Sequence, residues 1–138
     1  MVELAIAEEP KFKMSRVDID RGSPTFTIDT LQSFSRFHPD AKLYFLLGRD
    51  AFQSIASWKD SKKLAELAEF VVLSRPGFEF EASGKQLDYV HTSLVIDALD
   101  ISSTEIRNQL EKSGDLGEKV PAPVLSYIRE HGLYSGQM

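Results

Sequence analysis

Hydroxyl side chains and an arginine gather in one short stretch, ISSTEIRNQL at residues 101–110. Ser102 and Glu105 have the spacing of a capping box. In a capping box, the hydroxyl accepts a hydrogen bond from a first-turn backbone N–H, and the glutamate carboxylate accepts one from the backbone N–H of the cap residue. If the helix begins near Ser102, then Ser103 and Arg107 lie four residues apart on one face. Free amides, hydroxyls and a guanidinium would together bind a phosphate. The pattern leaves both a plain helix cap and a phosphate site open.

A glycine and an aspartate follow a second apolar run, in the segment GRD at residues 48–50. Gly48 could let a ligand approach the backbone closely, and Asp50 could accept hydrogen bonds from ribose hydroxyls. The alternative is a turn that ends a strand, with a solvated Asp50 that caps the next helix.

Two further segments could hold a flat ring that carries a carboxylate. Trp58, the only tryptophan, lies in the polar segment IASWKDSKK. It is either part of the core or a platform on which a heterocycle stacks. In SPTFTIDTL, Pro24 and Thr25 or Thr27 open a helix whose first-turn amides could bind a carboxylate.

Composition excludes several classes of function. The chain has 138 residues, 42% of them hydrophobic and 27% charged, which is typical of a soluble globular domain. The net charge of -5 argues against a broad nucleic-acid surface. The absence of cysteine excludes thiolate chemistry, and His38, His91 and His131 lack the spacing of a metal site.

The N-terminal sequence and the apolar runs bear on location. The start MVELAIAEEPKF indicates neither a secretory signal nor a transit peptide. No run approaches the roughly 20 apolar residues of a membrane span. We therefore expect a cytoplasmic protein that needs no membrane, and homo-oligomer formation is left open.

Strand and helix patterns alternate along the chain, which predicts an α/β fold with a mostly parallel sheet in one domain, 1–138. The predicted strands are 12–19, 42–48, 70–77 and 89–96, and the predicted helices are 2–7, 25–37, 61–68 and 121–134, with a loop or short helix at 49–58. The run KLYFLLG indicates a strand that is buried on both faces. A Pro-Gly turn closes the strand at 70–77, and residues 77–87 are predicted to form a polar surface loop.

Polar residues follow three of these strands. In an open α/β sheet, ligands bind beyond the carboxyl ends of the strands. The residues that should converge there are Gly48, Arg49 and Asp50, then Ser74 and Arg75, then Ser102, Ser103 and Thr104.

Taken as a set, the motifs resemble one enzyme family. ISSTEIR, TFTIDTL, YFLLGRDAFQSIASW, VVLSRPG and PAPVLSYIREHGLY resemble bacterial nicotinate-nucleotide adenylyltransferase over nearly the whole chain. The resemblance implies a Rossmann-like nucleotidyltransferase fold. It also implies transfer of AMP from ATP, taken with Mg²⁺, to nicotinate mononucleotide, giving deamido-NAD and pyrophosphate in NAD biosynthesis, with no tightly bound cofactor.

The resemblance assigns ATP to two of the motifs. Ser103, Thr104 and Arg107 correspond to the family's helix start that contacts the ATP phosphates. Gly48 and Asp50 correspond to the family's GxD segment along the nucleotide and its ribose.

Nicotinate mononucleotide is assigned to two other motifs. Thr27 and the backbone amide of Lys59 would hold the pyridine carboxylate, with Trp58 stacked on the ring. The family often has a tyrosine after this tryptophan, whereas this chain has Lys59. The resemblance therefore implies a backbone contact at Lys59 and assigns no role to its side chain.

One family motif has no counterpart. The family opens with a strand and a turn of the form GGTFDPxHxGH, whose histidines stabilise charge at the α-phosphate, and Met1 aligns within a helix past that motif. The resemblance thus implies a fold truncated at the N-terminus, with no catalytic residue identified. We expect the 138-residue chain to show no detectable deamido-NAD synthesis.

Two alternatives to the nicotinate-nucleotide enzyme are open. The first is a non-catalytic remnant of the fold that binds a nucleotide or associates with itself. The second is another nucleotidyltransferase, such as a phosphopantetheine adenylyltransferase. Trp58 and the TFT segment disfavour the second, because they suit a pyridine carboxylate.

Overall fold

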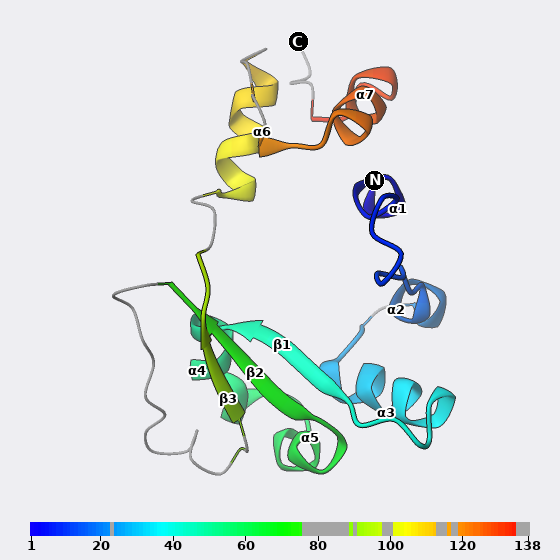
Figure 1. Cartoon of the computed structure of the whole chain (residues 1–138), viewed down its shortest axis with the longest axis vertical. Helices are drawn as coiled ribbons and strands as arrows, with labels where there is room; N and C mark the ends of the chain where they lie inside the picture. Colours follow the sequence, from blue (N-terminus) through cyan, green and yellow to red (C-terminus); the bar gives the residue numbers. More distant parts are fainter. Residues whose placement is uncertain are drawn as a thin grey trace. The chain divides into compact units, whose positions relative to one another are not determined.

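Three parallel strands organise the larger part of the computed structural model, which describes residues 1–22, 24–75, 89, 91–97, 101–112, 116 and 119–134. The chain forms two compact units, Arg16–Ala98 in one and Met1–Ser15 with Leu99–Met138 in the other. In the first unit, β1 (Tyr44–Gly48), β2 (Glu69–Ser74) and β3 (His91–Val95) pair in this order (Figure 1). The predicted α/β class and these three strands are confirmed.

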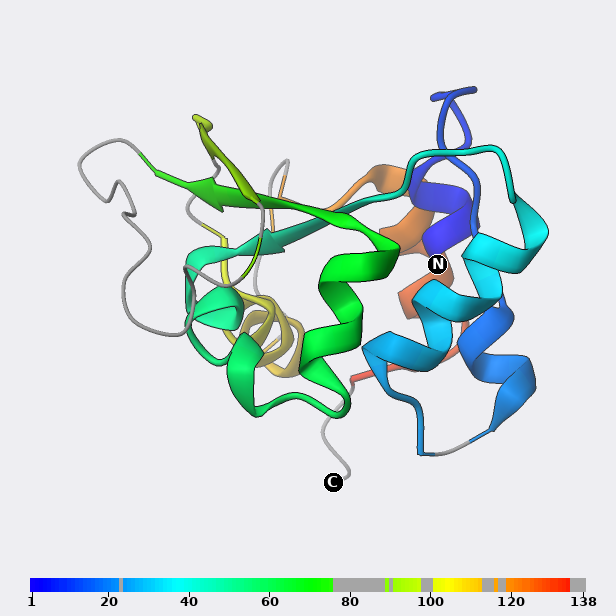
Figure 2. The ribbon, with the colours of Figure 1, turned by 90° about the horizontal axis from the view of Figure 1, so that it is seen from below.

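Helices cover one face of this sheet. They are α3 (Thr27–Phe37), α4 (Arg49–Gln53), the 3-10 helix η1 (Ile55–Ser57) and α5 (Ser61–Leu67). Figure 2 shows α3, α4 and α5 on the same side of the strands. Side chains of neighbouring parallel strands share a face, so Leu47 and its partner Val72 both point into this core. The other core residues include Ile28, Leu31, Phe52, Ile55, Leu64 and Phe70.

The opposite face of β1 differs from the expectation. The run at 42–48 predicted burial on both faces, but Tyr44 is 52% exposed and Leu46 is 61% exposed. Alternate side chains of a strand point to opposite faces, and a run of apolar residues does not reveal which face is covered. Burial on both faces is therefore wrong for β1, whereas most of β2 is buried.

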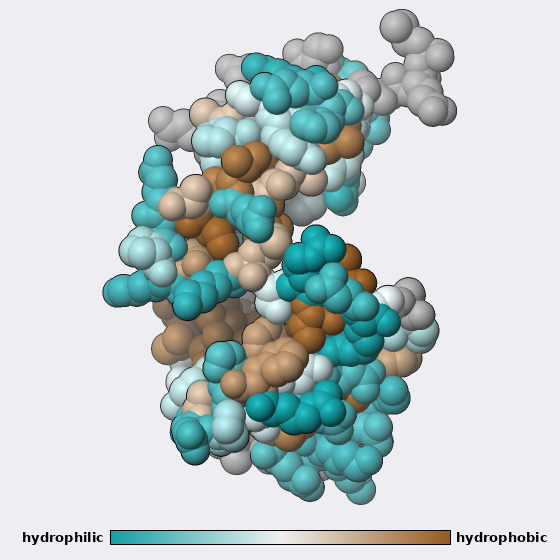
Figure 3. All heavy atoms as spheres, turned by 90° about the vertical axis from the view of Figure 1, so that its right-hand side faces the viewer, coloured by the Kyte–Doolittle hydropathy of each residue, from teal (hydrophilic) through white to brown (hydrophobic). Residues whose placement is uncertain are grey.

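The predicted strand at 12–19 is also wrong, because the chain forms α2 (Val17–Arg21) instead. Arg16 pairs with Asp20 four residues on at 3.1 Å, and Arg21 pairs with Asp18 three residues back at 2.9 Å. These spacings bring opposite charges together on a helix and not on a strand. Figure 3 shows a largely hydrophilic surface on the side of α2 and α3, interrupted by apolar patches.

The second unit is helical in its described part. It contains α1 (Val2–Ala5), α6 (Ser103–Glu111) and α7 (Ala122–Glu130), and α1 packs against α7. Beyond α7, Gly132 adopts a φ of +58°, and its N–H and that of Leu133 donate to the carbonyls of Arg129 and Ile128 at 3.2 and 2.9 Å. This pair of bonds is a Schellman motif, which favours glycine because of the positive φ. The predicted helix at 121–134 is confirmed as α7, which ends four residues earlier than predicted, at Glu130, whereas the Pro-Gly turn and the loop at 77–87 lie outside the described residues.

Candidate functional site

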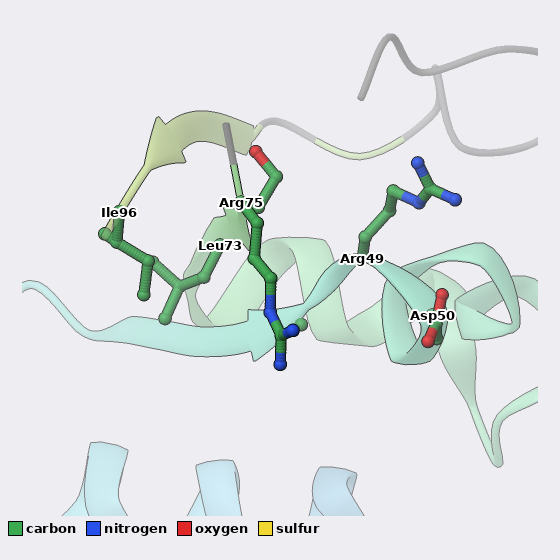
Figure 4. Close-up of a pocket in the computed structure, with 7 residues that line it drawn as sticks. Arg49, Asp50, Leu73, Arg75 and Ile96 are labelled. Atoms are coloured by element: carbon green, nitrogen blue, oxygen red, sulfur yellow. The ribbon is translucent and has the colours of Figure 1, made fainter. Parts of the chain in front are cut away.

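A pocket of about 510 Å³ lies at the carboxyl ends of β1 and β2 (Figure 4). Parallel strands end at the same edge of a sheet, so the residues that follow them meet there. The pocket is lined by Gly48, Arg49, Asp50, Leu73, Ser74, Arg75 and Ile96. The predicted convergence of the first two strand ends is confirmed.

Gly48 lines this pocket and leaves open space beside its backbone. Its φ of -73° and ψ of 158° are extended values that any residue adopts. A Cβ added at Gly48 would meet no atom within 4 Å. Neither the backbone nor the packing of the chain therefore requires glycine at this position, and the open space is available to a ligand.

Asp50 follows in the first turn of α4, and its exposed side chain lines the same pocket. Gly48 occupies the N-cap position of α4, and no side-chain hydrogen bond caps the helix. The alternative in which Asp50 caps the helix is therefore wrong. Its carboxylate remains available to accept hydrogen bonds from hydroxyl groups of a ligand.

The pocket carries two arginines and one buried hydroxyl. Ser74 is 7% exposed, and its Oγ has no hydrogen-bond partner in the described part of the chain. Figure 4 shows the side chain of Arg75 extending across the end of β1, and that of Arg49 pointing to the other side. Guanidinium groups bind phosphate oxygens through paired N–H donors. The pocket therefore suits an anionic ligand with hydroxyl groups.

A second cluster joins the start of α3 to the turn that contains Trp58. Lys59 lies thirty residues after Asp29, and its Nζ is 3.4 Å from Oδ2 of that residue. The same Nζ lies 4.3 Å from the centroid of the Phe26 ring. Phe26 is the N-cap of α3, which no side chain caps, and Thr27 is the first residue of the helix. The structure thus brings Thr27, Trp58 and Lys59 into one region.

Trp58 itself is partly buried against the core. Its Nε1–H donates to Ser54 Oγ at 3.2 Å. Its ring meets the ring of Phe45 edge-on, with centroids 6.3 Å apart and planes at 89°. The indole therefore packs against the core at Phe45, as expected for a tryptophan that is partly core, and the side chain stays partly exposed.

The start of α6 lies in the other unit. Ser102 is its N-cap, as predicted, and the carbonyl of Ser102 accepts a hydrogen bond from Ile106 N–H at 3.0 Å. No side-chain hydrogen bond caps α6, so the predicted capping-box bond is wrong. The side chains of Ser103, Thr104 and Arg107 are exposed on the helix. Its first-turn amides are consequently not occupied by a capping side chain.

The sequence of the chain also matches a family model. Residues 1–109 match the model of the cytidylyltransferase-like family. The chain belongs to the cytidylyltransferase-like family.

Relatives within this cytidylyltransferase-like family have consistent names. The chain is 44% identical over 135 residues to a probable nicotinate-nucleotide adenylyltransferase of Clavibacter michiganensis subsp. michiganensis, covering 97% of this chain and 66% of the relative. It is 44% identical over 142 residues to a protein of the same name from Mycobacterium tuberculosis strain H37Rv, covering 99% and 66%. The chain spans just under two thirds of the length of these curated relatives.

Solved structures show the same likeness. The nicotinic acid mononucleotide adenylyltransferase of Plasmodium falciparum complexed with APC matches with a TM-score of 0.63 and 28% identity, covering 82% of this chain and 60% of the other. The same Plasmodium falciparum protein complexed with NaAD matches with a TM-score of 0.61 and 30% identity, covering 80% and 58%. The Rossmann-like nucleotidyltransferase fold that the motifs predicted is confirmed for the cytidylyltransferase-like chain.

Two side chains of the cytidylyltransferase-like chain have shifted pKa values, and both lie at the opposite end of its sheet, where the strands begin. A hydrogen bond between Lys42 and Glu69, at the amino ends of β1 and β2, raises the pKa of Lys42 and lowers that of Glu69. Within the described residues, no group of three histidine, aspartate or glutamate side chains could hold a metal ion. No described helix is long and apolar enough to cross a membrane.

Proposed function

We propose that the chain serves nicotinate-nucleotide adenylyl transfer, in which AMP passes from ATP to nicotinate mononucleotide to give deamido-NAD and pyrophosphate. The observation that carries the proposal is the pocket at the carboxyl ends of β1 and β2, with its arginines and the open side of Gly48. The names of the relatives at 44% identity support the choice of substrates.

The reaction is an in-line displacement at phosphorus. A phosphate oxygen of the mononucleotide attacks the α-phosphorus of ATP, one P–O bond forms, and the bond from the α-phosphorus to the bridging oxygen breaks as pyrophosphate leaves. The protein forms no covalent bond in this scheme. Its contribution is to position the two substrates and to stabilise the charge that develops on the phosphoryl oxygens.

For ATP, we propose contacts at two places in the chain. Asp50 accepts hydrogen bonds from the ribose hydroxyls, and the backbone of Gly48 lies against the nucleotide. Ser103, Thr104 and Arg107 bind the phosphates through the uncapped start of α6, supported by the exposure of these side chains and by the helix dipole. Mg²⁺ arrives bound to the ATP phosphates, because Mg²⁺ prefers phosphate oxygens and water over all-protein cages.

For nicotinate mononucleotide, we propose the cluster at the start of α3. The N–H groups of the first turn at Thr27 and the backbone N–H of Lys59 bind the pyridine carboxylate, and Trp58 stacks on the ring. The uncapped start of α3 and the accessible part of Trp58 support this assignment. We place the reaction in the cytoplasm, with no nucleic acid and no membrane among the partners.

The test of the proposal is the binding of nicotinate mononucleotide by the chain and by its Trp58→Ala variant, measured by calorimetry. Loss of a stacking platform costs about 1–3 kcal/mol, so we expect binding to weaken by about 5- to 150-fold. Phe37→Ala is the matched control, since Phe37 is an exposed aromatic at the far end of α3 and lines none of the sites above.

Turnover is measured on the protein as its source cells make it, with any residues beyond these 138 included. Deamido-NAD formed from ATP, Mg²⁺ and nicotinate mononucleotide is quantified by chromatography. A protein that binds neither substrate would contradict the proposal. Equal binding by the parent chain and Trp58→Ala would contradict the stacking role alone.

A further inference from the structure

The side chain of Lys59 bridges two segments that are distant in the sequence. It follows Trp58 directly, and its Nζ reaches the first turn of α3 thirty residues earlier. At that turn it makes two contacts, an ion pair with Asp29 at 3.4 Å and an approach to the Phe26 ring at 4.3 Å. The contacted residues flank Thr27 on both sides.

These two contacts restrict Lys59 more than an ordinary surface ion pair does. The side chain of Asp29 is 29% exposed and that of Lys59 is 46% exposed, so solvent screens the pair only in part. A cation over an aromatic face is attracted by the ring quadrupole. The two contacts together orient the lysine side chain toward the start of α3 and join the two segments.

Trp58 itself is held by contacts with two other residues. Its Nε1–H donates to Ser54 Oγ, and its ring packs edge-on against Phe45. The indole plane is thereby set by the core. Lys59 spans the distance from this ring to the first turn of α3.

We propose that Lys59 is a positioning residue that latches the Trp58 turn to the start of α3 and presets the width of the nicotinate pocket. The proposal rests on the proposed function for the identity of the ligand, whereas the latch itself exists without ligand. Nothing in the resemblance assigned a role to this side chain, since the family often has tyrosine at the position.

The latch is tested first without ligand. Trp58 is the sole tryptophan, so its fluorescence reports on this turn alone. We expect Lys59→Met to increase the quenching of Trp58 by acrylamide, because the turn opens more often. Lys63→Met is the matched control: Lys63 also pairs with an aspartate, Asp60 at 3.2 Å, but lies on α5. Equal quenching in the parent chain and Lys59→Met would overturn the latch.

Ligand binding then separates positioning from direct charge contact. We expect Lys59→Met to weaken nicotinate mononucleotide binding by about fivefold, from the loss of one ion pair and one cation–π contact. The amide analogue, nicotinamide mononucleotide, should lose affinity by the same factor, since a preset width serves both. A loss of affinity for nicotinate mononucleotide alone would overturn the proposal, because it would indicate that the ammonium group of Lys59 binds the carboxylate directly.

Two further variants complete the design. Lys59→Arg keeps a cation that can pair with Asp29 and stack on Phe26, so it should restore the affinity and the quenching of the parent chain. In a double-mutant cycle, Asp29→Asn should add little to the effect of Lys59→Met on quenching, because both remove the same ion pair. Full additivity would overturn the proposal.

The two proposals fail in different ways. If the parent chain binds no nicotinate mononucleotide, the proposed function fails, and the quenching experiment still decides whether the latch exists. If the parent chain binds the mononucleotide and Lys59→Met behaves like Lys63→Met in both experiments, the latch fails and the proposed function stands.

Discussion

At the scale of single residues, a substitution at Gly48 distinguishes what folding requires from what ligand binding requires. Its extended backbone and the open space around an added Cβ mean that alanine fits the folded chain. Replacing a glycine by alanine at a compatible position also reduces the entropy of the unfolded chain. We therefore expect Gly48→Ala to leave the free energy of unfolding unchanged or to raise it by about 0.5 kcal/mol.

The same substitution should impair ATP binding. If the nucleotide lies against the backbone of Gly48, a methyl group intrudes on it, and an intrusion of this kind costs about 1–3 kcal/mol. Calorimetry should show weaker binding of ATP, and the affinity for nicotinate mononucleotide serves as the internal control. Unchanged ATP affinity would show that the nucleotide does not approach this backbone.

Single residues also show how much of the site could be predicted from the sequence. The strand-end positions of Ser74 and Arg75 pointed to the pocket, but no pattern revealed that Ser74 Oγ is buried with no hydrogen-bond partner among the described residues. The side-chain contacts of Lys59 were not predictable either. They depend on how α3 meets a turn thirty residues away, and no local pattern encodes that meeting.

At the scale of elements, one ion pair makes the sheet sensitive to pH at its amino end. Lys42 precedes β1 and pairs with Glu69, the first residue of β2, which also accepts a hydrogen bond from Thr92 of β3 at 3.3 Å. The hydrogen bond with Lys42 is the main cause that lowers the pKa of Glu69, and the hydrogen bond with Glu69 raises the pKa of Lys42. The interaction therefore holds only while both groups are charged.

The sign of the effect follows from these directions. The contribution of Glu69 is present above its ordinary pKa of 4.5 and is lost as the pH falls through the lowered value. The contribution of Lys42 is present below 10.5 and is lost as the pH rises through the raised value. Urea unfolding should show Glu69→Gln less stable than the parent chain at neutral pH, with the difference vanishing at both extremes. A difference that persists in acid would contradict the role of the carboxylate.

The elements also show why three strand predictions succeeded and one failed. The strands β1 and β2 were recognisable because each is a short apolar run, and β3 because it lies in the segment YVHTSLVI, which has apolar and β-branched residues. The segment before α3 misled, since Val17 and Ile19 alternate as in a strand while the charges of α2 follow helical spacing. The spacing of these ion pairs fits a helix, and the two apolar residues alone could not exclude one.

At the scale of the whole chain, the proposed ligands should protect different stretches of backbone. That residues 1–138 form one domain stays a prediction, and the described residues fall into two compact units. Hydrogen exchange of backbone amides, read by mass spectrometry, follows each stretch separately. Bound ligand stabilises the residues that it contacts and slows their exchange.

We expect nicotinate mononucleotide to slow exchange at 26–29 and 57–59, where the uncapped start of α3 and the turn at Trp58 lie. ATP with Mg²⁺ should slow exchange at 48–50 and at 103–107. At a ligand concentration 100 times its Kd, protection corresponds to about 2.7 kcal/mol, or roughly a hundredfold slowing where exchange requires the bound state to open. Because no side-chain hydrogen bond caps α6 in the described part of the chain, its first-turn amides can donate to a bound phosphate, which should slow their exchange. Protection by ATP at 48–50 without protection at 103–107 would remove Ser103, Thr104 and Arg107 from the proposed site and leave the strand-end pocket as the whole of it.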